Sequence, residues 1–313
     1  MADIRFVQAD TLKEKPADVS KVGFGRVFTD YMFEMDYNPE EGWHDARIVP
    51  YQDVPLSPAN ATLHYGQAIF EGCKAYRYEG GKAVVFRAKD HIARLNRSAK
   101  ILDIPEVDEK LVYDALMKLI DLEKDWIPDG PGQSLYIRPF IFSTDPYLGV
   151  SVGQYYKMMI ILSPVGAYYA NGFAPVKIMV EDTYVRAPKG GLGAAKTPAN
   201  YAASLHGGLI AHEKGYDQTL WTDGIEHKYI GEVGSMNILF KIDGKVVTPE
   251  LDGTILDGIT RRTVLRVCKE WGIPTEERRI SIDELIEDYE NGKLEEVFGS
   301  GTAAVISPVS VLG

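Results

Sequence analysis

Residues 190–201 read GGLGAAKTPANY and place one lysine, Lys196, at the end of a loop made almost entirely of glycine and alanine. Glycine reaches positive φ values and has no Cβ, so such a loop lets the backbone approach a ligand closely. Apart from Lys196, no Asp, Glu, Lys or Arg stands between Lys189 and Glu213. A lysine amine without a local carboxylate, in small-residue surroundings, is typical of amines that react with carbonyl groups. A flexible surface loop with a solvated lysine is the alternative interpretation.

The same stretch nearly matches a phosphate-binding P-loop, whose pattern is G-x-x-x-x-G-K-[ST]. Ala195 replaces the glycine before the lysine, and Pro198 follows Thr197. The lysine and threonine of a P-loop begin the following helix, but a residue before proline is pushed out of the α-helical region. We therefore expect Thr197 to be the N-cap and Pro198 the first residue of a helix, with Lys196 just outside it. This argues against a nucleotide-binding P-loop protein.

Length and composition limit the class of protein. The chain has 313 residues, enough for two domains, and its net charge of −11 argues against nucleic acid or an anionic membrane as the main partner. Cys73 and Cys268 are the only cysteines, so we expect no disulfide framework and a reducing compartment. The N-terminal residues lack the apolar core of a signal peptide, and no stretch approaches the roughly 18 apolar residues of a membrane helix. The expected location is the cytoplasm.

Hydrophobic periodicity divides the chain into two sets of elements around an irregular segment, residues 166–175. Strands are expected at residues 24–37, 83–87, 134–143, 157–165, 176–181, 218–222, 228–232, 236–242 and 296–298. Helices are expected at residues 89–102, 108–126, 198–213, 259–271 and 282–289. The pattern predicts an α+β or α/β enzyme with a smaller N-terminal domain (1–165), an interdomain loop (166–175) and a larger C-terminal domain (176–313). We expect the small-molecule site between the domains.

If Lys196 binds an aldehyde cofactor such as pyridoxal phosphate, the site needs three further groups. A carboxylate should face the pyridine nitrogen, because a protonated ring is the better electron sink. Glu232, in the apolar context YIGEVGSMN, is the candidate, although an edge-strand glutamate would look similar. A hydroxyl should bind the phenolic oxygen of the ring, and Tyr201, one turn into the expected helix, could do so.

The third group is a phosphate cradle, for which the sequence offers two candidates. Gly258-Ile259-Thr260 opens an expected helix whose free N–H groups suit an anion. Gly299-Ser300-Gly301-Thr302 is expected to be a small-residue turn between apolar strands. Arg94, placed on a polar helix face by the pattern HIARLNRSA, could add a cationic clamp, or could be a solvated helix arginine.

Taken together and in order, these segments closely resemble the branched-chain amino acid aminotransferases, pyridoxal phosphate enzymes of the class IV aminotransferase group (fold type IV). The resemblance runs from about Phe24 to Pro308 and is carried by FGRVFTDYMFEMDY, LHYGQAIFEGCKAYR, SLYIRPF, GAYYANG, KTPANYAASL, GEVGSMN, LDGTILDGITRRTVL and EVFGSGTAAVISPV. It covers nearly the whole chain, and the motifs are jointly specific.

The resemblance implies a role for each matching residue. Lys196 would be the Schiff-base lysine and would carry the proton between Cα and C4′, with Glu232 at the pyridine nitrogen and Tyr201 at O3′. The phosphate would be bound by Arg94, Ile259, Thr260 and Thr302. The substrate would be bound by Tyr65, Tyr136, Arg138 and the backbone of Ala303 and Ala304. The apolar pocket would be formed by Phe24, Phe70 and Tyr168, with Val150 from a second subunit, because the family is dimeric. No metal is expected.

The implied activity is reversible transamination of L-leucine, L-isoleucine and L-valine with 2-oxoglutarate by ping-pong kinetics. The nearest alternatives on the same fold are a D-amino acid transaminase, an R-selective amine transaminase and aminodeoxychorismate lyase. A catalytically silent scaffold would be expected to lack Lys196 or Glu232. Some mammalian relatives carry a C-x-x-C pair where this chain reads TAAVIS, so no thiol switch is expected. Family members usually continue beyond the position of Gly313, so either a C-terminal tail is missing or it is dispensable.

Overall fold

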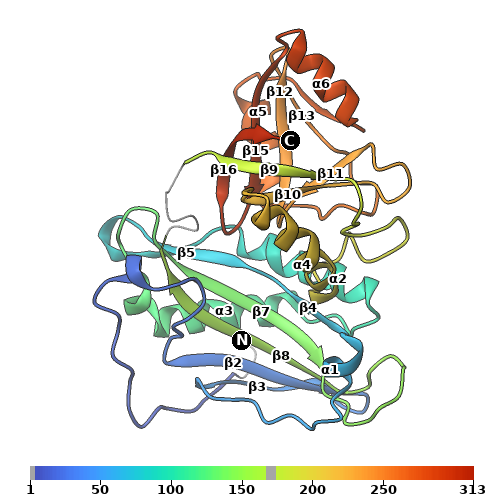
Figure 1. Cartoon of the computed structure of the whole chain (residues 1–313). Coiled ribbons are helices and arrows are strands. Elements are labelled where there is room, and N and C mark those ends of the chain that lie inside the picture. Colours follow the sequence, from blue (N-terminus) through green and yellow to red (C-terminus); the bar gives the residue numbers. More distant parts are fainter. Residues whose placement is uncertain (1–3, 167–173) are drawn as a thin grey trace. The chain divides into compact units, whose positions relative to one another are not determined.

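The computed structural model describes residues 4–166 and 174–313, which form two compact units, Met1–Tyr168 and Tyr169–Gly313. Each unit is built on one eight-stranded sheet with helices packed against it (Figure 1). Residues 167–173 of the expected interdomain loop, which include Tyr168, lie outside the described residues. Within residues 4–166 and 174–313, no helix combines the length and apolar character needed to cross a membrane.

The sheet of the first unit has the strand order β1-β3-β2-β8-β7-β5-β6, and β4 also pairs with β7. Its strands are β1 (Arg5–Phe6), β2 (Tyr31–Asn38), β3 (Gly42–Pro50), β4 (Ala68–Phe70), β5 (Cys73–Arg77), β6 (Ala83–Val85), β7 (Ser134–Ser143) and β8 (Tyr156–Val165). Its α-helices are α1 (Ala61–Tyr65), α2 (Ala88–Ile101) and α3 (Glu109–Leu122). Short 3₁₀ turns lie at Val19–Lys21, Glu79–Gly81 and Lys124–Trp126.

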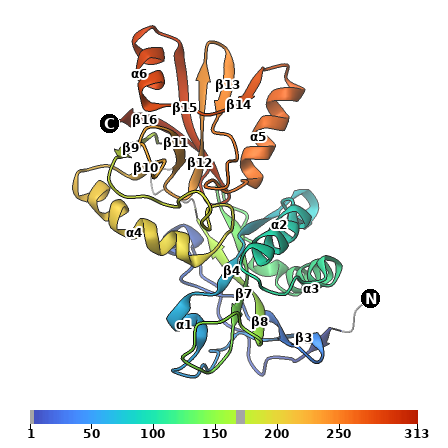
Figure 2. The same ribbon diagram turned by 90° about the vertical axis from the view of Figure 1, so that its right-hand side faces the viewer.

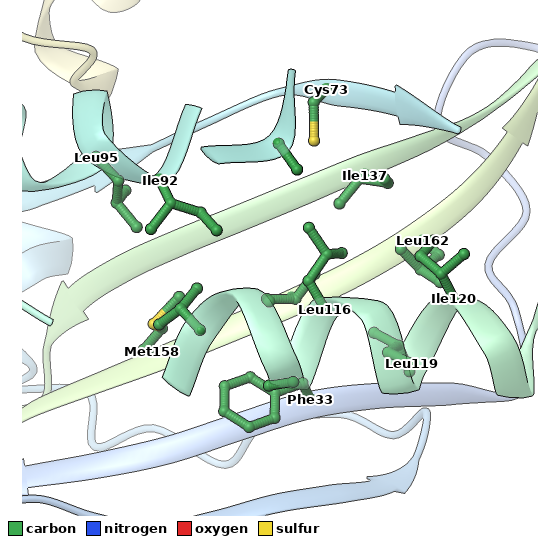
Figure 3. Packing of buried hydrophobic residues seen from close by; sticks show 14 of the residues in the cluster. Phe33, Cys73, Ile92, Leu95, Leu116, Leu119, Ile120, Ile137, Met158 and Leu162 are labelled. Atoms are coloured by element: carbon green, nitrogen blue, oxygen red, sulfur yellow. The ribbon is translucent and has the colours of Figure 1, made fainter. Parts of the chain in front are cut away.

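One face of this sheet carries the core of the first unit. Helices α2 and α3 supply apolar side chains at helical spacing, and the strands supply every second residue. Figure 3 shows these side chains meeting between helix and sheet: Phe33, Cys73, Ile92, Leu95, Leu116, Leu119, Ile120, Ile137, Met158 and Leu162. Burying each large aliphatic side chain contributes about 1.5–3 kcal/mol, so this layer fixes the sheet firmly. Because Ile137 faces the core, its neighbours Tyr136 and Arg138 project from the opposite face.

The sheet of the second unit contains a closed ring of strands. Six strands follow one another in the order β11-β10-β9-β16-β15-β12, and the pairing of β11 with β12 joins the two ends. The strands are β9 (Val176–Glu181), β10 (Gln218–Thr222), β11 (Ile230–Val233), β12 (Met236–Ile242), β13 (Lys245–Thr248), β14 (Thr275–Glu277), β15 (Leu294–Gly301) and β16 (Val305–Leu312). Strands β13 and β14 continue the sheet beyond β12.

Three helices pack against this second sheet (Figure 2). Helix α4 (Pro198–Glu213) contacts β9 and β10, whereas α5 (Ile259–Glu270) and α6 (Ile282–Glu290) contact β15. Alternation along β12 divides the apolar residues into two clusters. Ile238 and Phe240 belong to the cluster that includes Leu285 of α6, and Leu239 packs with Cys268 of α5. Both cysteines are buried and free.

The structure confirms the predicted helices and most predicted strands to within a few residues, with three differences. Residues 24–30 are not a strand: Gly25 has a positive φ of 68°, and β2 begins only at Tyr31. Helix α3 ends at Leu122 instead of continuing to Trp126, because the chain turns at Glu123 into a 3₁₀ turn. Strands β1, β3, β4, β5, β13 and β14 and helix α1 were not predicted, and β16 was expected only as an apolar run at residues 303–306.

The predicted turn at residues 299–302 is wrong in a way that concerns the site. Residues Gly299 to Gly301 belong to strand β15, and the turn that follows comprises residues 302–304. A Cβ on Gly299 would lie 2.7 Å from Cε of Met236 on the neighbouring strand. A side chain at residue 299 would displace the end of Met236, so Gly299 takes part in the packing of β15 on β12 and not in a turn.

Candidate active site

The lysine loop is ordered by its own contacts. Thr197 has extended backbone angles (φ −126°, ψ 146°) and is the N-cap of α4, with Pro198 at the first helical position, as predicted. The side-chain amide of Asn200 donates to the carbonyl oxygens of Leu192 (2.8 Å) and Ala195 (2.9 Å). These bonds tie the loop to the first turn of α4, so it is a fixed element, and Lys196 lies just before the helix.

Close packing explains one glycine of this loop. A Cβ on Gly193 would lie 2.3 Å from the carbonyl oxygen of Thr254 and 2.5 Å from its Cα. The loop therefore rests directly on the backbone of the segment that leads into α5. The lysine amine itself donates a hydrogen bond to the hydroxyl of Tyr201, with Nζ and Oη 2.8 Å apart. The structure thus brings together the predicted lysine and the predicted tyrosine.

Glu232 on β11 is buried, with 4% of its surface exposed, and is not the solvated edge-strand glutamate of the alternative interpretation. Its Oε2 forms an ion pair with Nε of Arg186 at 2.8 Å. Its Oε1 accepts hydrogen bonds from Nδ2 of Asn237 (2.9 Å) and from the backbone N–H of Leu256 (3.0 Å). A buried carboxylate with a cationic partner and two further donors is stabilised in its charged form.

Both predicted phosphate cradles lie next to Asn237. A Cβ on Gly258, the N-cap of α5, would lie 1.9 Å from Oδ1 of Asn237. Asn237 is also the register partner of Ser300 on β15. Gly258 has no side chain with which to cap the first turn of α5, where Ile259 and Thr260 stand, and the N-terminus of a helix is an anion site. Thr302, Ala303 and Ala304 form the turn that follows β15.

Arg94 does not lie on a polar helix face, contrary to the sequence interpretation. It is 4% exposed, and its Nε and Nη2 bind Oε1 and Oε2 of Glu71 at 2.7 and 3.0 Å. Nδ1 of His91 lies 2.8 Å from Oε2 of the same carboxylate. Burial alone would raise the pKa of Glu71, but the charge of Arg94 and the hydrogen bonds from His91 and Arg94 hold that pKa well below its usual range.

Glu71 and His91 were missed, although the sequence carried a signal for them. His91 and Arg94 are three residues apart on α2, and such a spacing places two side chains on one helix face. That face is buried, so its two polar groups require a partner of opposite charge. The only acidic residue in the apolar stretch AIFEGCKAY is Glu71.

Four of the predicted substrate-binding residues meet on the second face of the first sheet. Nη2 of Arg138 donates to the hydroxyl of Tyr136 (3.1 Å), and the guanidinium lies 4.6 Å from the ring centre of Phe70. Phe24 packs edge-on against Tyr136, with ring centres 4.8 Å apart. A Cβ on Gly72 would lie 2.1 Å from the Tyr136 hydroxyl, so a side chain there would displace that hydroxyl.

Lys74 is a further residue that sequence reasoning missed. It is the register partner of Tyr136 across β5 and β7, so both side chains leave the same face of the sheet. The side chain is buried, and this burial lowers the pKa of Lys74 to about 8. Its sequence context, CKAYR, is that of an ordinary strand, and burial of a lysine could not be foreseen from it.

Tyr65 and Val150 lie on exposed parts of the first unit. Tyr65 is the last residue of α1 and is 45% exposed, and Val150 is 86% exposed on the segment between β7 and β8. That segment is anchored by the buried Asp145, which accepts hydrogen bonds from Oγ of Ser143 (2.7 Å) and from the backbone of residue 154. Of the predicted substrate-side residues, Tyr168 lies outside the described residues.

Comparison with known proteins identifies the class. The family model for amino-transferase class IV matches residues 68–312. The chain belongs to the class IV aminotransferase family, and the predicted two-domain fold type IV architecture is thereby confirmed.

Relatives within the family narrow this further. A probable branched-chain-amino-acid aminotransferase of Staphylococcus aureus (strain N315) is 54% identical over 310 residues, which cover 99% of this chain and 86% of the relative. Branched-chain-amino-acid aminotransferase 2 of Bacillus subtilis (strain 168) is 55% identical over 309 residues, which cover 99% and 85%. These identities place the chain among the branched-chain-amino-acid aminotransferases of that family.

A solved structure agrees with this placement. The branched-chain amino acid aminotransferase from Escherichia coli superposes with a TM-score of 0.72 at 31% identity, covering 90% of this chain and 85% of that one. A further solved branched-chain amino acid aminotransferase, with a TM-score of 0.72 at 27% identity and the same coverage, is complexed with N-(5'-phosphopyridoxyl)-L-glutamate.

Proposed function

We propose that this protein catalyses reversible transamination of L-leucine, L-isoleucine and L-valine with 2-oxoglutarate, and that its cofactor is pyridoxal 5'-phosphate. The observation that carries the proposal is the buried, ion-paired Glu232 in the same unit as the Lys196–Tyr201 pair. Burying a carboxylate costs free energy, and a buried carboxylate that faces a pyridine nitrogen would keep this nitrogen protonated. The names of the relatives, at 54% and 55% identity, support the choice of substrates.

The residues of the second unit fit this cofactor. Lys196 would bind the aldehyde carbon, Tyr201 the phenolic oxygen and Glu232 the ring nitrogen. The backbone N–H groups at Ile259 and Thr260 would hold the phosphate at the N-terminus of α5, where the helix dipole favours negative charge. Thr302 would add a hydroxyl from the turn after β15, and Arg94, as the resemblance implies, would add a positive charge. Bound there, pyridoxal phosphate supplies an electron sink for the electron pair released at the substrate Cα.

The chain's own groups then have defined tasks. The amine of Lys196 would take the proton from the substrate Cα and give it up at C4′, which is the general acid–base role of a positioned lysine. The hydroxyl of Tyr201, at 2.8 Å in this structure, orients that amine. The Glu232 carboxylate holds a proton on the ring nitrogen, because a buried anion favours a charged partner.

The predicted substrate-binding residues would have two kinds of contact to make. One pocket has to accept a branched aliphatic side chain and, in the other half-reaction, the γ-carboxylate of glutamate. The rings of Phe24 and Phe70 suit the first, while the Arg138 guanidinium and the Tyr136 hydroxyl suit the second. Tyr65 would add a second hydroxyl, and the backbone N–H groups of Ala303 and Ala304 would bind the α-carboxylate. Alternation of the two substrates on one pocket gives ping-pong kinetics.

The proposal includes a homodimer in the cytoplasm. Val150 stands in a segment whose other large apolar side chains are also exposed, namely Tyr147, Leu148 and Val152. Asp145 ties the two ends of this segment together, and a group of exposed apolar side chains is typical of a surface that binds another protein chain. Two free cysteines and no disulfide framework are consistent with a reducing compartment.

The test is a substrate panel preceded by a cofactor titration. We expect wild-type protein to bind pyridoxal phosphate, to convert L-leucine, L-isoleucine and L-valine with 2-oxoglutarate, and to leave D-alanine unchanged. Turnover of D-alanine without L-leucine would instead indicate a D-amino acid transaminase. Tight Mg-ATP binding without cofactor binding would indicate a nucleotide-binding protein, which the extended Thr197 at the N-cap already disfavours.

A further inference from the structure

Glu232 is held by three groups that sequence reasoning did not assign. Arg186, in the segment between β9 and α4, forms the ion pair at 2.8 Å, and Asn237 and the backbone of Leu256 supply the two other donors. Arg186 and Asn237 are both largely buried, and neither is placed in contact with cofactor by the proposed function. They act on the site through Glu232 and through the backbone near it.

Both side chains also bind the segment that leads into helix α5. Nη1 of Arg186 donates to the carbonyl oxygen of Thr254 at 2.8 Å. Nδ2 of Asn237 donates to the carbonyl oxygen of Leu256 at 2.9 Å, and its Oδ1 occupies the space that a side chain at Gly258 would need. Residues 254–258, which we call the joining segment, therefore connect Glu232 to the first turn of α5.

The lysine loop rests on the same segment. Gly193 approaches Thr254 so closely that no Cβ fits between them. The three elements that the proposed function requires, namely the lysine loop, Glu232 and the N-terminus of α5, thus share contacts with five consecutive residues. A displacement of the joining segment would change the distances among all three elements together.

We propose that Arg186 and Asn237 are positioning residues for the cofactor site. Arg186 keeps Glu232 ionised, so that the shared proton stays on the pyridine nitrogen, and Asn237 fixes the distance between Glu232 and the phosphate-binding turn of α5. The inference rests on the proposed function, because it assigns to both residues an effect on the pyridoxal phosphate that this function requires.

The two roles follow from different physics and have different consequences. Without Arg186, the buried Glu232 anion loses the ion pair at 2.8 Å, and taking the proton from the ring nitrogen is the least costly way for it to become neutral. Without Asn237 the charges are unchanged, but Glu232 and Leu256 lose their common donor. The ring proton then stays in place while the geometry loosens.

The charge role is tested with pyridoxal phosphate labelled with ¹⁵N at the ring nitrogen. In the wild type and in Asn237→Ala we expect the chemical shift of a protonated pyridine, and in Arg186→Met that of a neutral one. Arg186→Lys keeps the charge but lacks the planar fork that reaches both Glu232 and Thr254, so its ring should stay protonated. A protonated ring in Arg186→Met, or a neutral ring in Arg186→Lys, overturns the charge role.

The positioning role is tested by the dissociation constant of pyridoxal phosphate from the apoenzyme, measured by fluorescence quenching. Groups that orient metal ligands typically change metal affinity about 10- to 100-fold when removed, and we expect Asn237→Ala and Arg186→Lys to weaken cofactor binding to a similar extent. The control is Arg266→Met, which removes an exposed ion pair with Glu270 and should change neither measurement. Wild-type affinity in Asn237→Ala overturns the positioning role.

The wild-type measurements separate this inference from the proposed function. If wild-type protein binds no pyridoxal phosphate, the proposed function fails and the inference fails with it. If wild-type protein binds the cofactor and transaminates while the variants match it in both measurements, only the inference fails. Should Arg186→Met not fold, Arg186→Gln offers Glu232 an amide donor but no charge, and a protonated ring in that variant contradicts the charge role.

Discussion

Replacing Gly193 by alanine should destabilise the second unit and weaken the site, for a reason that the distances give directly. The new Cβ would lie 2.3 Å from the carbonyl oxygen of Thr254, where ordinary contact requires 3.4 Å, so the two segments must separate by about 1 Å. The obstacle is backbone, which cannot rotate away as a side chain would. Overpacking of this kind typically costs about 1–3 kcal/mol.

The same displacement moves Lys196 relative to Glu232. A misplacement of about 1 Å can cost about 100-fold in rate, so we expect a larger loss in kcat than the stability change alone would cause. Thermal unfolding of the apoenzyme measures the first effect, with about 2–4 °C expected for each kcal/mol, and steady-state kinetics with L-leucine measures the second.

A matched glycine in the same unit provides the control. Gly208 lies inside helix α4, and apart from the adjacent residues and the backbone of its own helix no atom lies within 4 Å of the position that an added methyl group would take. Gly208→Ala should therefore raise the free energy of unfolding by about 0.8–1 kcal/mol through helix propensity. Opposite signs for the two substitutions are the expected result. If Gly193→Ala has the unfolding temperature and the kcat of the wild type, the close packing of the lysine loop contributes neither to stability nor to catalysis.

Three further predictions concern charged groups. Lys196→Ala should abolish transamination without changing the unfolding temperature much, whereas the exposed Lys189→Ala should retain activity; comparable residual turnover in both would contradict the role of Lys196. Arg94→Met leaves the Glu71 carboxylate buried without its cation and should cost about 3–5 kcal/mol in a urea titration; an unchanged midpoint would contradict this. Burial raises the pKa of Glu123 from 4.5 to about 7. The folded protein therefore binds this proton more tightly than the unfolded chain does. As the pH rises from 4.5 to 7 the protein loses up to roughly 3 kcal/mol of stability. Glu123→Gln should remove that pH dependence from unfolding curves recorded at pH 5 and pH 8, and a slope as steep as in wild type would show that another group titrates.

Local sequence signals predicted the lysine loop and much of the fold. Pro198 after Thr197 fixes the start of α4 because proline determines φ at its own position and restricts the residue before it. Apolar residues at helical spacing predicted α2 because that pattern is also what buries the helix on the sheet. Such signals act within a few residues, and the structure confirms them.

Partners from distant segments could not be predicted in the same way. Arg186 and Glu232 are 46 positions apart, and nothing in either context specifies the other. Arg94 was placed on a polar face because HIARLNRSA contains many polar residues. In the structure the buried Glu71 carboxylate binds the Arg94 guanidinium and offsets the cost of burying it. Strand β3, with the sequence GWHDARIVP, was not predicted because Asp45 and Arg47 interrupt its apolar pattern. In the structure Arg47 forms ion pairs with Asp36 of the neighbouring β2 and with Asp45 of its own strand.

The closed ring of strands in the second unit makes the pairing of β11 with β12 sensitive to a bound ligand. Strands β11 and β12 pair through Glu232 with Asn237 and through Val233 with Met236. The pairing that closes the ring is therefore the hairpin that carries the Glu232 carboxylate. Any ligand that binds the closed form alone stabilises it by about 2.7 kcal/mol at 100 times its dissociation constant. Amide hydrogen exchange along β11 should therefore slow when cofactor is added, and that exchange rate would report occupancy of the site without any measurement of turnover.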